Sequence, residues 1–334
     1  MGIDYGYCRW LAAALVALGD AGSRARRETA RHIHCTRLPF MHPLASSSCT
    51  APLSPSRREG VLCAALLAGV ALALAGPFVP PGPQAYAYAD QRTLWGLPHA
   101  MDVLTNLPFA LLGLFGLARL AARVREGALR VATVAAAGLF FAGLLLTAGG
   151  SALYHWQPHG ITLLADRAGM LVAFSGMLAL AVDERIGARA AALAGATVLA
   201  GGAAALRTWG ITGDLWPWAV LQGGGMLLLL ALAADAWRCR RAGRAPLPGR
   251  LGVSLAAVIG WYGLAKLLEA GDAAVFAATG HLVSGHSLKH LAAAMAAWPL
   301  LAALAPGRYF ARCERGTPWR GRREGTMPAG AKSK

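Results

Sequence analysis

Five polar side chains stand in two stretches of the sequence that are otherwise mostly apolar. Ser151 and His155 are four residues apart, and Asp166 follows eleven residues after that histidine. Near the end of the chain, His286 and His290 are again four residues apart. Residues at this spacing lie on one face of a helix, so each pair would present its side chains in the same direction.

Histidines at this spacing can act as metal ligands. Two imidazoles one turn apart on a helix can chelate a single ion. A third histidine from a neighbouring helix completes a three-histidine set with one open position, the pattern of catalytic zinc sites. A histidine pair alone is more often a feature of packing, and it is the combination of five residues that favours a site. We predict that zinc is bound by His155, His286 and His290.

The remaining two residues, Asp166 and Ser151, are the predicted catalytic residues. Zinc held by three neutral histidines is a strong Lewis acid and lowers the pKa of water to about 7. Asp166 would accept the water's proton and return it to the departing amine, because an amide anion is a very poor leaving group. Ser151 would stabilise the developing oxyanion by about 3 kcal/mol. Apolar walls would hold acyl chains, so the predicted substrate is a lipid amide.

The composition of the chain excludes an ordinary soluble protein. The 334 residues are 56% hydrophobic and only 14% charged, yet the formal net charge is +16. Soluble domains carry about 25% charged residues. A nucleic-acid-binding protein would also be richer in charge, so no nucleic-acid partner is expected. The composition predicts an all-α, polytopic membrane protein whose few charges lie in loops and tails.

Eight apolar stretches are long enough, at roughly 20 residues each, to cross a bilayer. Backbone groups in lipid must form hydrogen bonds internally, and apolar runs without strict alternation favour helices over a barrel. The predicted architecture is a seven-transmembrane-helix core with one extra N-terminal transmembrane helix. The predicted spans are about 61–80, 101–122, 130–154, 161–182, 188–206, 216–237, 251–270 and 285–305.

Basic residues are concentrated at the two ends of the chain and in alternate links between spans. Eight arginines lie in residues 1–60, eight Lys or Arg in 307–334, and eleven arginines in alternate links. The positive-inside rule then places both termini in the cytoplasm and the five site residues at the other end. Residues 1–60 are a predicted disordered leader or an over-extended translation start. Residues 306–334 are a predicted disordered cytoplasmic tail, and Ala, Arg and Gly enrichment favours a bacterial inner membrane.

The SxxxH motif, the aspartate eleven residues later and the distant HxxxH motif together resemble the alkaline ceramidases. These enzymes belong to a superfamily of seven-helix membrane hydrolases that includes the adiponectin-receptor-like proteins. The resemblance covers about residues 85–305 and excludes the first span, 61–80. The segment AMDVLTNLPFALLG also resembles the family's first core helix, where an Asn follows Ser or Thr, here Thr105 and Asn106.

The resemblance implies zinc at the three histidines, with Ser151 and Asp166 contacting the water or the substrate carbonyl. It further implies hydrolysis of ceramide or a related N-acyl lipid. Eukaryotic ceramidases also bind calcium through an acidic N-terminal segment. Here the matching segment offers Asp90 and Asp102, too few for the six to eight oxygen ligands of calcium, so calcium binding is in doubt.

Three charged residues near the motifs have simpler expected roles. Lys266 and Glu269 are three residues apart and are expected to form an ion pair. Lys289 lies about 100° away from the histidine face and is expected to extend towards the membrane surface. Two other functions stay open beside the amidase. One is a phospholipid esterase with the same site, and the other is a non-enzymatic metal-binding or metal-transport protein. The oligomeric state is open.

Overall fold

The computed structural model describes residues 55–81, 88–127, 129–243 and 249–305. These residues belong to one compact unit. Within them the secondary structure is helical, apart from an isolated β-bridge between Leu94 and Leu97. The predicted all-α fold is therefore confirmed. Residues 1–54 of the predicted leader and the whole predicted tail, 306–334, lie outside the described residues.

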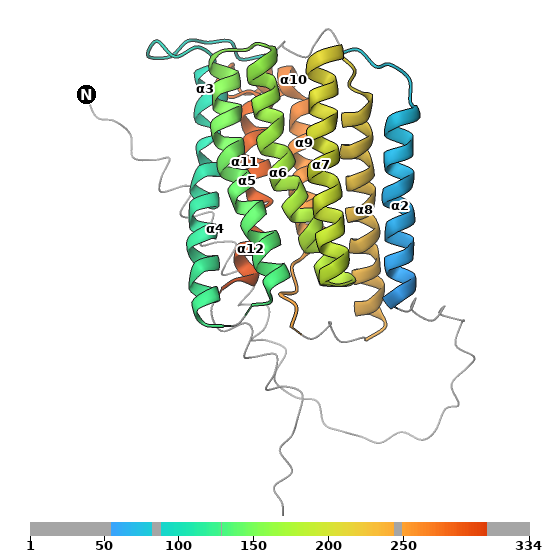
Figure 1. Cartoon of the computed structure of the whole chain (residues 1–334). Coiled ribbons are helices and arrows are strands. Elements are labelled where there is room, and N and C mark those ends of the chain that lie inside the picture. Colours follow the sequence, from blue (N-terminus) through green and yellow to red (C-terminus); the bar gives the residue numbers. More distant parts are fainter. Residues whose placement is uncertain (1–54, 82–87, 128, 244–248, 306–334) are drawn as a thin grey trace, which may run out of the picture. The chain divides into compact units, whose positions relative to one another are not determined.

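Six helical segments among the described residues are long and apolar enough to cross a bilayer. Figure 1 shows them running side by side. This arrangement makes the chain an integral membrane protein. The segments are α2 (Pro55–Ala75), α3 (Ala100–Leu104) continued by α4 (Leu107–Arg125), α5 (Val131–Trp156), α6 (Gly160–Arg185), α7 (Ala188–Thr212) and α8 (Trp216–Arg241).

The last two predicted spans, 251–270 and 285–305, are not among these six segments, and shorter helices occupy both regions. Helix α9 (Leu255–Ala270) has 16 residues and is followed by α10 (Asp272–Ala278). The region predicted as one span at 285–305 is divided into α11 (Gly285–Met295) and α12 (Trp298–Ala303). Pro299 stands in the first turn of α12, and a proline has no N–H to continue the hydrogen-bond ladder of the preceding helix.

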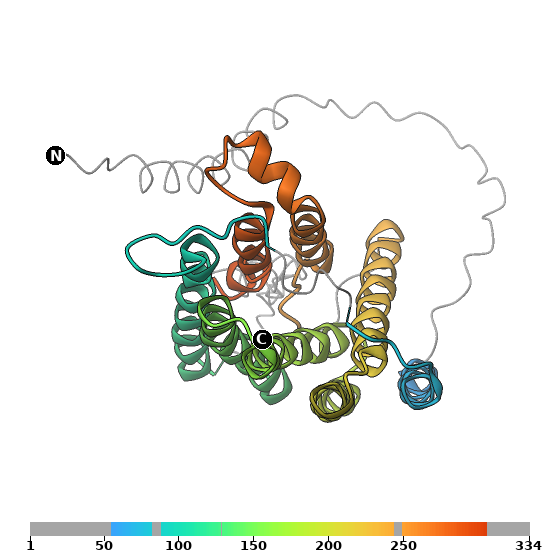
Figure 2. The same ribbon diagram turned by 90° about the horizontal axis from the view of Figure 1, so that it is seen from above.

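The first span begins earlier than predicted. Helix α2 starts at Pro55, inside the predicted leader, and ends at Ala75, just before Gly76 and Pro77. Proline is tolerated in the first turn of a helix but not in its interior, which accounts for both ends. Figure 2 shows α2 at the edge of the bundle beside α8. Arg58 of α2 lies 3.5 Å from the Asp235 carboxylate of α8.

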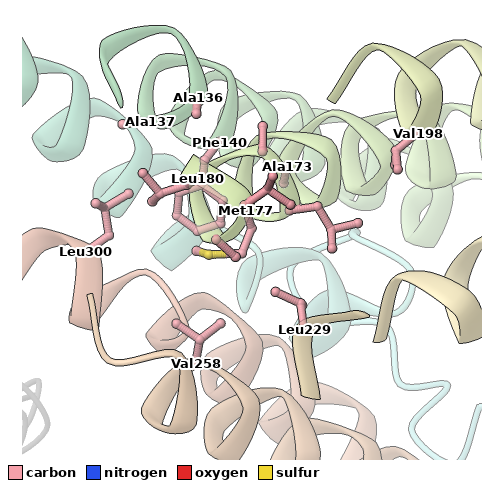
Figure 3. Close-up of a cluster of buried hydrophobic side chains, with 14 of the residues drawn as sticks. Ala136, Ala137, Phe140, Ala173, Met177, Leu180, Val198, Leu229, Val258 and Leu300 are labelled. Atoms are coloured by element: carbon pink, nitrogen blue, oxygen red, sulfur yellow. The ribbon is translucent and has the colours of Figure 1, made fainter. Parts of the chain in front are cut away.

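The closest packing in the unit joins α5 to α6. A Cβ on Gly143 would lie 2.1 Å from the backbone nitrogen of Ala173, and one on Gly176 would lie 2.3 Å from that of Phe140. The two backbones therefore touch, as in other small-residue contacts between membrane helices. Side chains of both helices form part of the buried apolar cluster in Figure 3. This pair carries three of the five predicted site residues, Ser151, His155 and Asp166.

A buried ionic cluster lies at the other end of the bundle from the five site residues. Asp183 of α6 is fully buried and accepts hydrogen bonds from Arg130 and Arg250 at 3.0 and 2.7 Å. The next residue, Glu184, accepts the backbone N–H of Leu251 at 2.8 Å. These contacts attach the chain that leads into α9 to the C-terminal end of α6.

Candidate metal centre

Three buried histidines meet at one end of the bundle. His155 comes from the last turn of α5, whereas His286 and His290 come from the first two turns of α11. Their exposed fractions are only 2–4%, and candidate ligand nitrogens of the three rings lie within 4.8 Å of one another. Nε2 of His155 is 3.2 Å from Nε2 of His286. The three side chains could hold one metal ion.

The turn between α5 and α6 sets the relative depth of the residues on these two helices. His159 caps α6, because its backbone N–H donates to Thr162 Oγ1 at 3.1 Å and its ring accepts from the Thr162 N–H. The link is short, so α6 returns antiparallel beside α5. A Cβ on Gly150 would lie 2.5 Å from the Ala165 carbonyl oxygen, so the backbones touch next to Ser151 and Asp166.

Helix α11 begins at a heavily bonded N-terminus. Ser284 accepts the Ser287 N–H at 2.9 Å, and the Ser287 hydroxyl donates to Asp102 Oδ1 at 2.6 Å. The backbone N–H of His286 donates to Asp272 Oδ1 at 2.8 Å. One of these bonds is the helix's own N-cap, and the other two, to Asp102 and Asp272, hold the first turn of α11 against neighbouring segments.

Thr105, singled out by the ceramidase resemblance, supports one of the histidines. Its Oγ1 lies 3.0 Å from Nδ1 of His290, and its hydroxyl is 2.7 Å from the Met101 carbonyl oxygen. A carbonyl only accepts, so the Thr105 hydrogen points to Met101 and its oxygen accepts from His290 Nδ1–H. The neutral imidazole then carries its lone pair on Nε2, the form that binds a metal.

Tyr88, which the spacing of the motifs does not predict, covers two of the histidines. Its ring centroid lies 4.9 Å from that of His155 and 4.3 Å from that of His286. Its hydroxyl donates to the Tyr154 hydroxyl at 3.0 Å. Burial raises the pKa of the Tyr88 phenol well above its ordinary value, and the bond with Tyr154 adds to the effect. The phenol is therefore uncharged at neutral pH.

The segment that carries Tyr88 is held by the α9–α11 region. Asp272 Oδ2 accepts the Ala89 N–H at 2.9 Å. Arg92 bonds both oxygens of Asp90 and also donates to the Leu282 carbonyl at 2.8 Å. Burial alone would raise the pKa of Asp90, but the hydrogen bonds and charge of Arg92 outweigh it and hold this pKa below its usual value. Asp90, considered above for calcium, thus has a cationic partner.

All five predicted site residues line one cavity of about 380 Å³. Ser151 and Asp166 are buried, and Oδ2 of Asp166 accepts a hydrogen bond from Arg167 at 2.9 Å. Among the described residues, no hydrogen bond engages Oδ1 of Asp166. Below the polar end the walls are apolar and include Phe140, Leu144, Phe174, Met177, Trp218 and Leu229. The site thus combines ionisable groups with space for a hydrocarbon chain.

The cavity also contains the three charged residues from α9 and α11. Lys266 and Glu269 form the predicted ion pair, with Nζ 2.7 Å from Oε2. The expectation for Lys289 is wrong. Its Nζ lies 2.6 Å from Oε1 of Glu269, and its side chain is only 17% exposed, so it faces α9 and not the membrane surface. From its angle on α11 alone, Lys289 could have faced lipid. Helix α9 packs on that side of α11 and supplies the carboxylate of Glu269 as its partner.

Comparisons with known proteins do not assign the chain to a family. No family model matches it, and no curated protein or solved structure matches it either. The resemblance to the alkaline ceramidases therefore rests on the motif residues themselves.

Proposed function

We propose that this protein is an integral-membrane, zinc-dependent hydrolase that cleaves the amide bond of ceramide or a related N-acyl lipid. One observation carries the proposal. Three buried histidines, with candidate ligand nitrogens within 4.8 Å of one another, line the same cavity as Ser151 and Asp166. The cluster alone fits many metal proteins, and it is the shared cavity with a serine, a carboxylate and apolar walls that favours lipid hydrolysis.

The donor set suits zinc. Buried neutral imidazoles are preferred ligands of zinc, and three of them leave a position open. The bond between Thr105 and His290 Nδ1 orients Nε2 as the donor atom, as a supporting group does in other metal sites. When bound to three neutral histidines, zinc supplies a Lewis acid that lowers the pKa of water to about 7.

The polar residues of the cavity have distinct proposed roles. Asp166 holds the proton of the attacking water on Oδ1 and passes it to the departing amine nitrogen. Arg167 donates a hydrogen bond to Oδ2 at 2.9 Å and so fixes the orientation of the carboxylate. Ser151 Oγ donates a hydrogen bond to the carbonyl oxygen as negative charge develops there. Tyr88 shields two histidine rings from bulk water.

The cavity is large enough for part of a lipid. Its volume of about 380 Å³ lies within the usual range for small-molecule pockets, about 300–1,000 Å³. Apolar walls from α5, α6, α8 and α9 would surround an acyl chain beside the scissile bond. A lipid would supply the hydrophobic contact, and the polar end would act on the bond near its head group.

We also propose that the protein lies in a bacterial inner membrane with both termini in the cytoplasm. The proposal rests on the arginine-rich links, which follow α4, α6 and α8 at the end of the bundle opposite the histidines. In this orientation α9 and the α11–α12 pair complete a seven-helix core, with α2 as the extra helix. Protease accessibility of tags at the two termini in sealed inside-out vesicles tests this orientation.

Purified protein in detergent tests the enzymatic proposal. We expect bound zinc by elemental analysis and release of free amine from a fluorescent ceramide. His286→Ala is expected to lose both zinc and turnover, and Asp166→Asn to lose turnover only. His281→Ala, at an exposed loop position outside the cluster, is the matched control. Full turnover by metal-stripped His286→Ala would refute the proposal. Release of a lyso-phospholipid would identify an esterase, and metal flux without hydrolysis would identify a transporter.

A further inference from the structure

Three charged side chains form a compact cluster in the cavity beside the histidines. Glu269 of α9 accepts from Lys266 of the same helix at 2.7 Å and from Lys289 of α11 at 2.6 Å. All three residues line the cavity. One carboxylate thus serves two ammonium groups. One lysine is enough to neutralise Glu269. The cluster of two lysines and one glutamate therefore has a net charge of +1.

The charge count of the whole cavity gives the same sign. Lys266, Lys289 and Arg167 are its cations, whereas Asp166 and Glu269 are the carboxylates among the described residues that line it. The excess is one positive charge before any metal is bound. Each lysine ammonium has three donors. In the part of the chain that the structure describes, each ammonium donates one hydrogen bond, to Glu269. Each therefore has two N–H donors left for a ligand.

The position of Lys289 connects this charge to the reacting bond. Lys289 precedes His290 and lies three residues after His286, so the two side chains at 286 and 289 are neighbours on α11. An anion held by Lys289 would therefore lie at the polar end of the cavity, near the scissile bond, and not among the apolar walls. The Lys266 side chain is half exposed and the Lys289 side chain only 17% exposed, so the pair reaches from the protein surface to the inner, polar part of the cavity.

We propose that the cluster of Lys266, Glu269 and Lys289 recognises a carboxylate or phosphate on the head group of the lipid substrate. The protein would then prefer acidic N-acyl lipids to neutral ones. This inference rests on the proposed amide hydrolysis, and it adds the chemical class of the head group. Two ammonium groups bonded to the same carboxylate lie close together with donors to spare, which suits an oxyanion with two or three oxygens.

Two matched substrate pairs test the preference. N-oleoylglycine and N-oleoylethanolamine share the acyl chain and the amide and differ by a carboxylate in place of a hydroxymethyl group. Ceramide 1-phosphate and ceramide differ by a phosphate. We expect kcat/KM to favour the acidic member of at least one pair about tenfold or more, as for a hydrogen bond to a charged group. The pair with the larger ratio identifies a carboxylate or a phosphate. Equal values within both pairs would overturn the inference.

Variants of the cluster separate recognition from a structural ion pair. Lys289→Gln and Lys266→Gln each remove one charge and are expected to lower the ratio of acidic to neutral turnover. Glu269→Gln releases both ammonium groups and is expected to raise it. Arg207→Gln, at an exposed position on α7, is the charge-matched control and should not change the ratio. A purely structural ion pair would leave the ratio unchanged in every variant, which would contradict recognition.

Equilibrium binding keeps the inference separate from the hydrolase proposal. We would measure how well N-oleoylglycine and N-oleoylethanolamine displace a fluorescent fatty acid from the purified protein. Ceramide 1-phosphate and ceramide are compared in the same way. If no substrate is hydrolysed, tighter binding of an acidic ligand that weakens in Lys289→Gln would support recognition while hydrolysis fails. Equal binding within both pairs would refute recognition. Should Lys289→Gln fail to fold, Lys289→Arg, which keeps the charge, must retain the preference.

Discussion

Thr105 Oγ1 lies 3.0 Å from Nδ1 of His290, and the threonine's own hydrogen is directed to the Met101 carbonyl. This contact joins the first helix of the core to the last histidine of the cluster, across 185 residues of sequence. It also selects the tautomer that leaves Nε2 free for a metal.

Removal of this acceptor is expected to weaken metal binding. Thr105→Val keeps the shape of the side chain but leaves His290 Nδ1–H without its partner. Loss of such a supporting bond typically lowers metal affinity about 10–100-fold. Competition with a zinc chelator in detergent measures the effect, and Thr105→Ser, which keeps the hydroxyl, is the control. Identical affinity in Thr105→Val and the wild type would show that Thr105 does not orient His290.

The start of α11 is expected to tolerate no side chain at Gly285. A Cβ there would lie 2.2 Å from the Leu268 carbonyl oxygen and 2.7 Å from Asp272 Cα, and both are backbone atoms that cannot rotate away. Gly285→Ala should therefore displace the first turn of α11 and the adjacent His286, lowering both Tm and zinc content. Gly260→Ala on α9, where nothing lies within 4 Å, is the control and should change neither. A normal zinc content in Gly285→Ala would contradict this account.

The ionic cluster at the opposite end is expected to contribute strongly to stability. Asp183→Asn removes a fully buried charge that two arginines share, and breaking a buried pair costs about 3 kcal/mol. The carboxylate of Asp235 is 34% exposed, and its pair with Arg185 should contribute about 1 kcal/mol or less. Denaturant unfolding in detergent compares Asp183→Asn with Asp235→Asn. A larger loss in Asp235→Asn would reverse this assignment.

The segment over the histidines is expected to loosen in acid. Arg92 holds the pKa of Asp90 below its usual value of about 3.9. The stability from this pair is therefore fully present above pH about 4 and is lost as the pH falls through the lowered pKa of the folded state. The Tm difference between the wild type and Asp90→Asn should be constant from pH 7 to about 5 and shrink at lower pH. A difference that grows in acid would contradict the sign.

The sequence alone predicted the helical fold and which residues share a cavity. His155 and Ser151 stand one turn apart, and the short link before Asp166 forces the next helix to return beside them. The spacing and the link length are local properties of the sequence. The length of the apolar runs then predicts that the segments are membrane-spanning helices. The span limits were less accurate, because Pro55 can begin a helix and Pro299 interrupts one. Those effects depend on single residues inside long apolar segments.

Contacts between distant segments could not be read from spacing. Tyr88 lies in a tyrosine-rich stretch before the first core helix, and bonds to distant residues, such as that between Ala89 and Asp272, hold it over the histidines. The position of Lys289 on α11 indicates only that its side chain does not point in the same direction as the two histidines. Whether that direction meets lipid or protein depends on how α9 packs against α11, and Glu269 on α9 decides it.

The three histidines lie on two helix pairs, α5 with α6 and α9 with α11. Helices α5 and α6 touch through glycines, whereas α11 packs against α9 and α4, as Figure 2 shows. A metal bound by His155, His286 and His290 would therefore cross-link the two helix pairs. Its occupancy would limit how far the pairs can separate, and with it the width of the lipid cavity. Loss of the ion would then remove a link across the cavity as well as its chemistry.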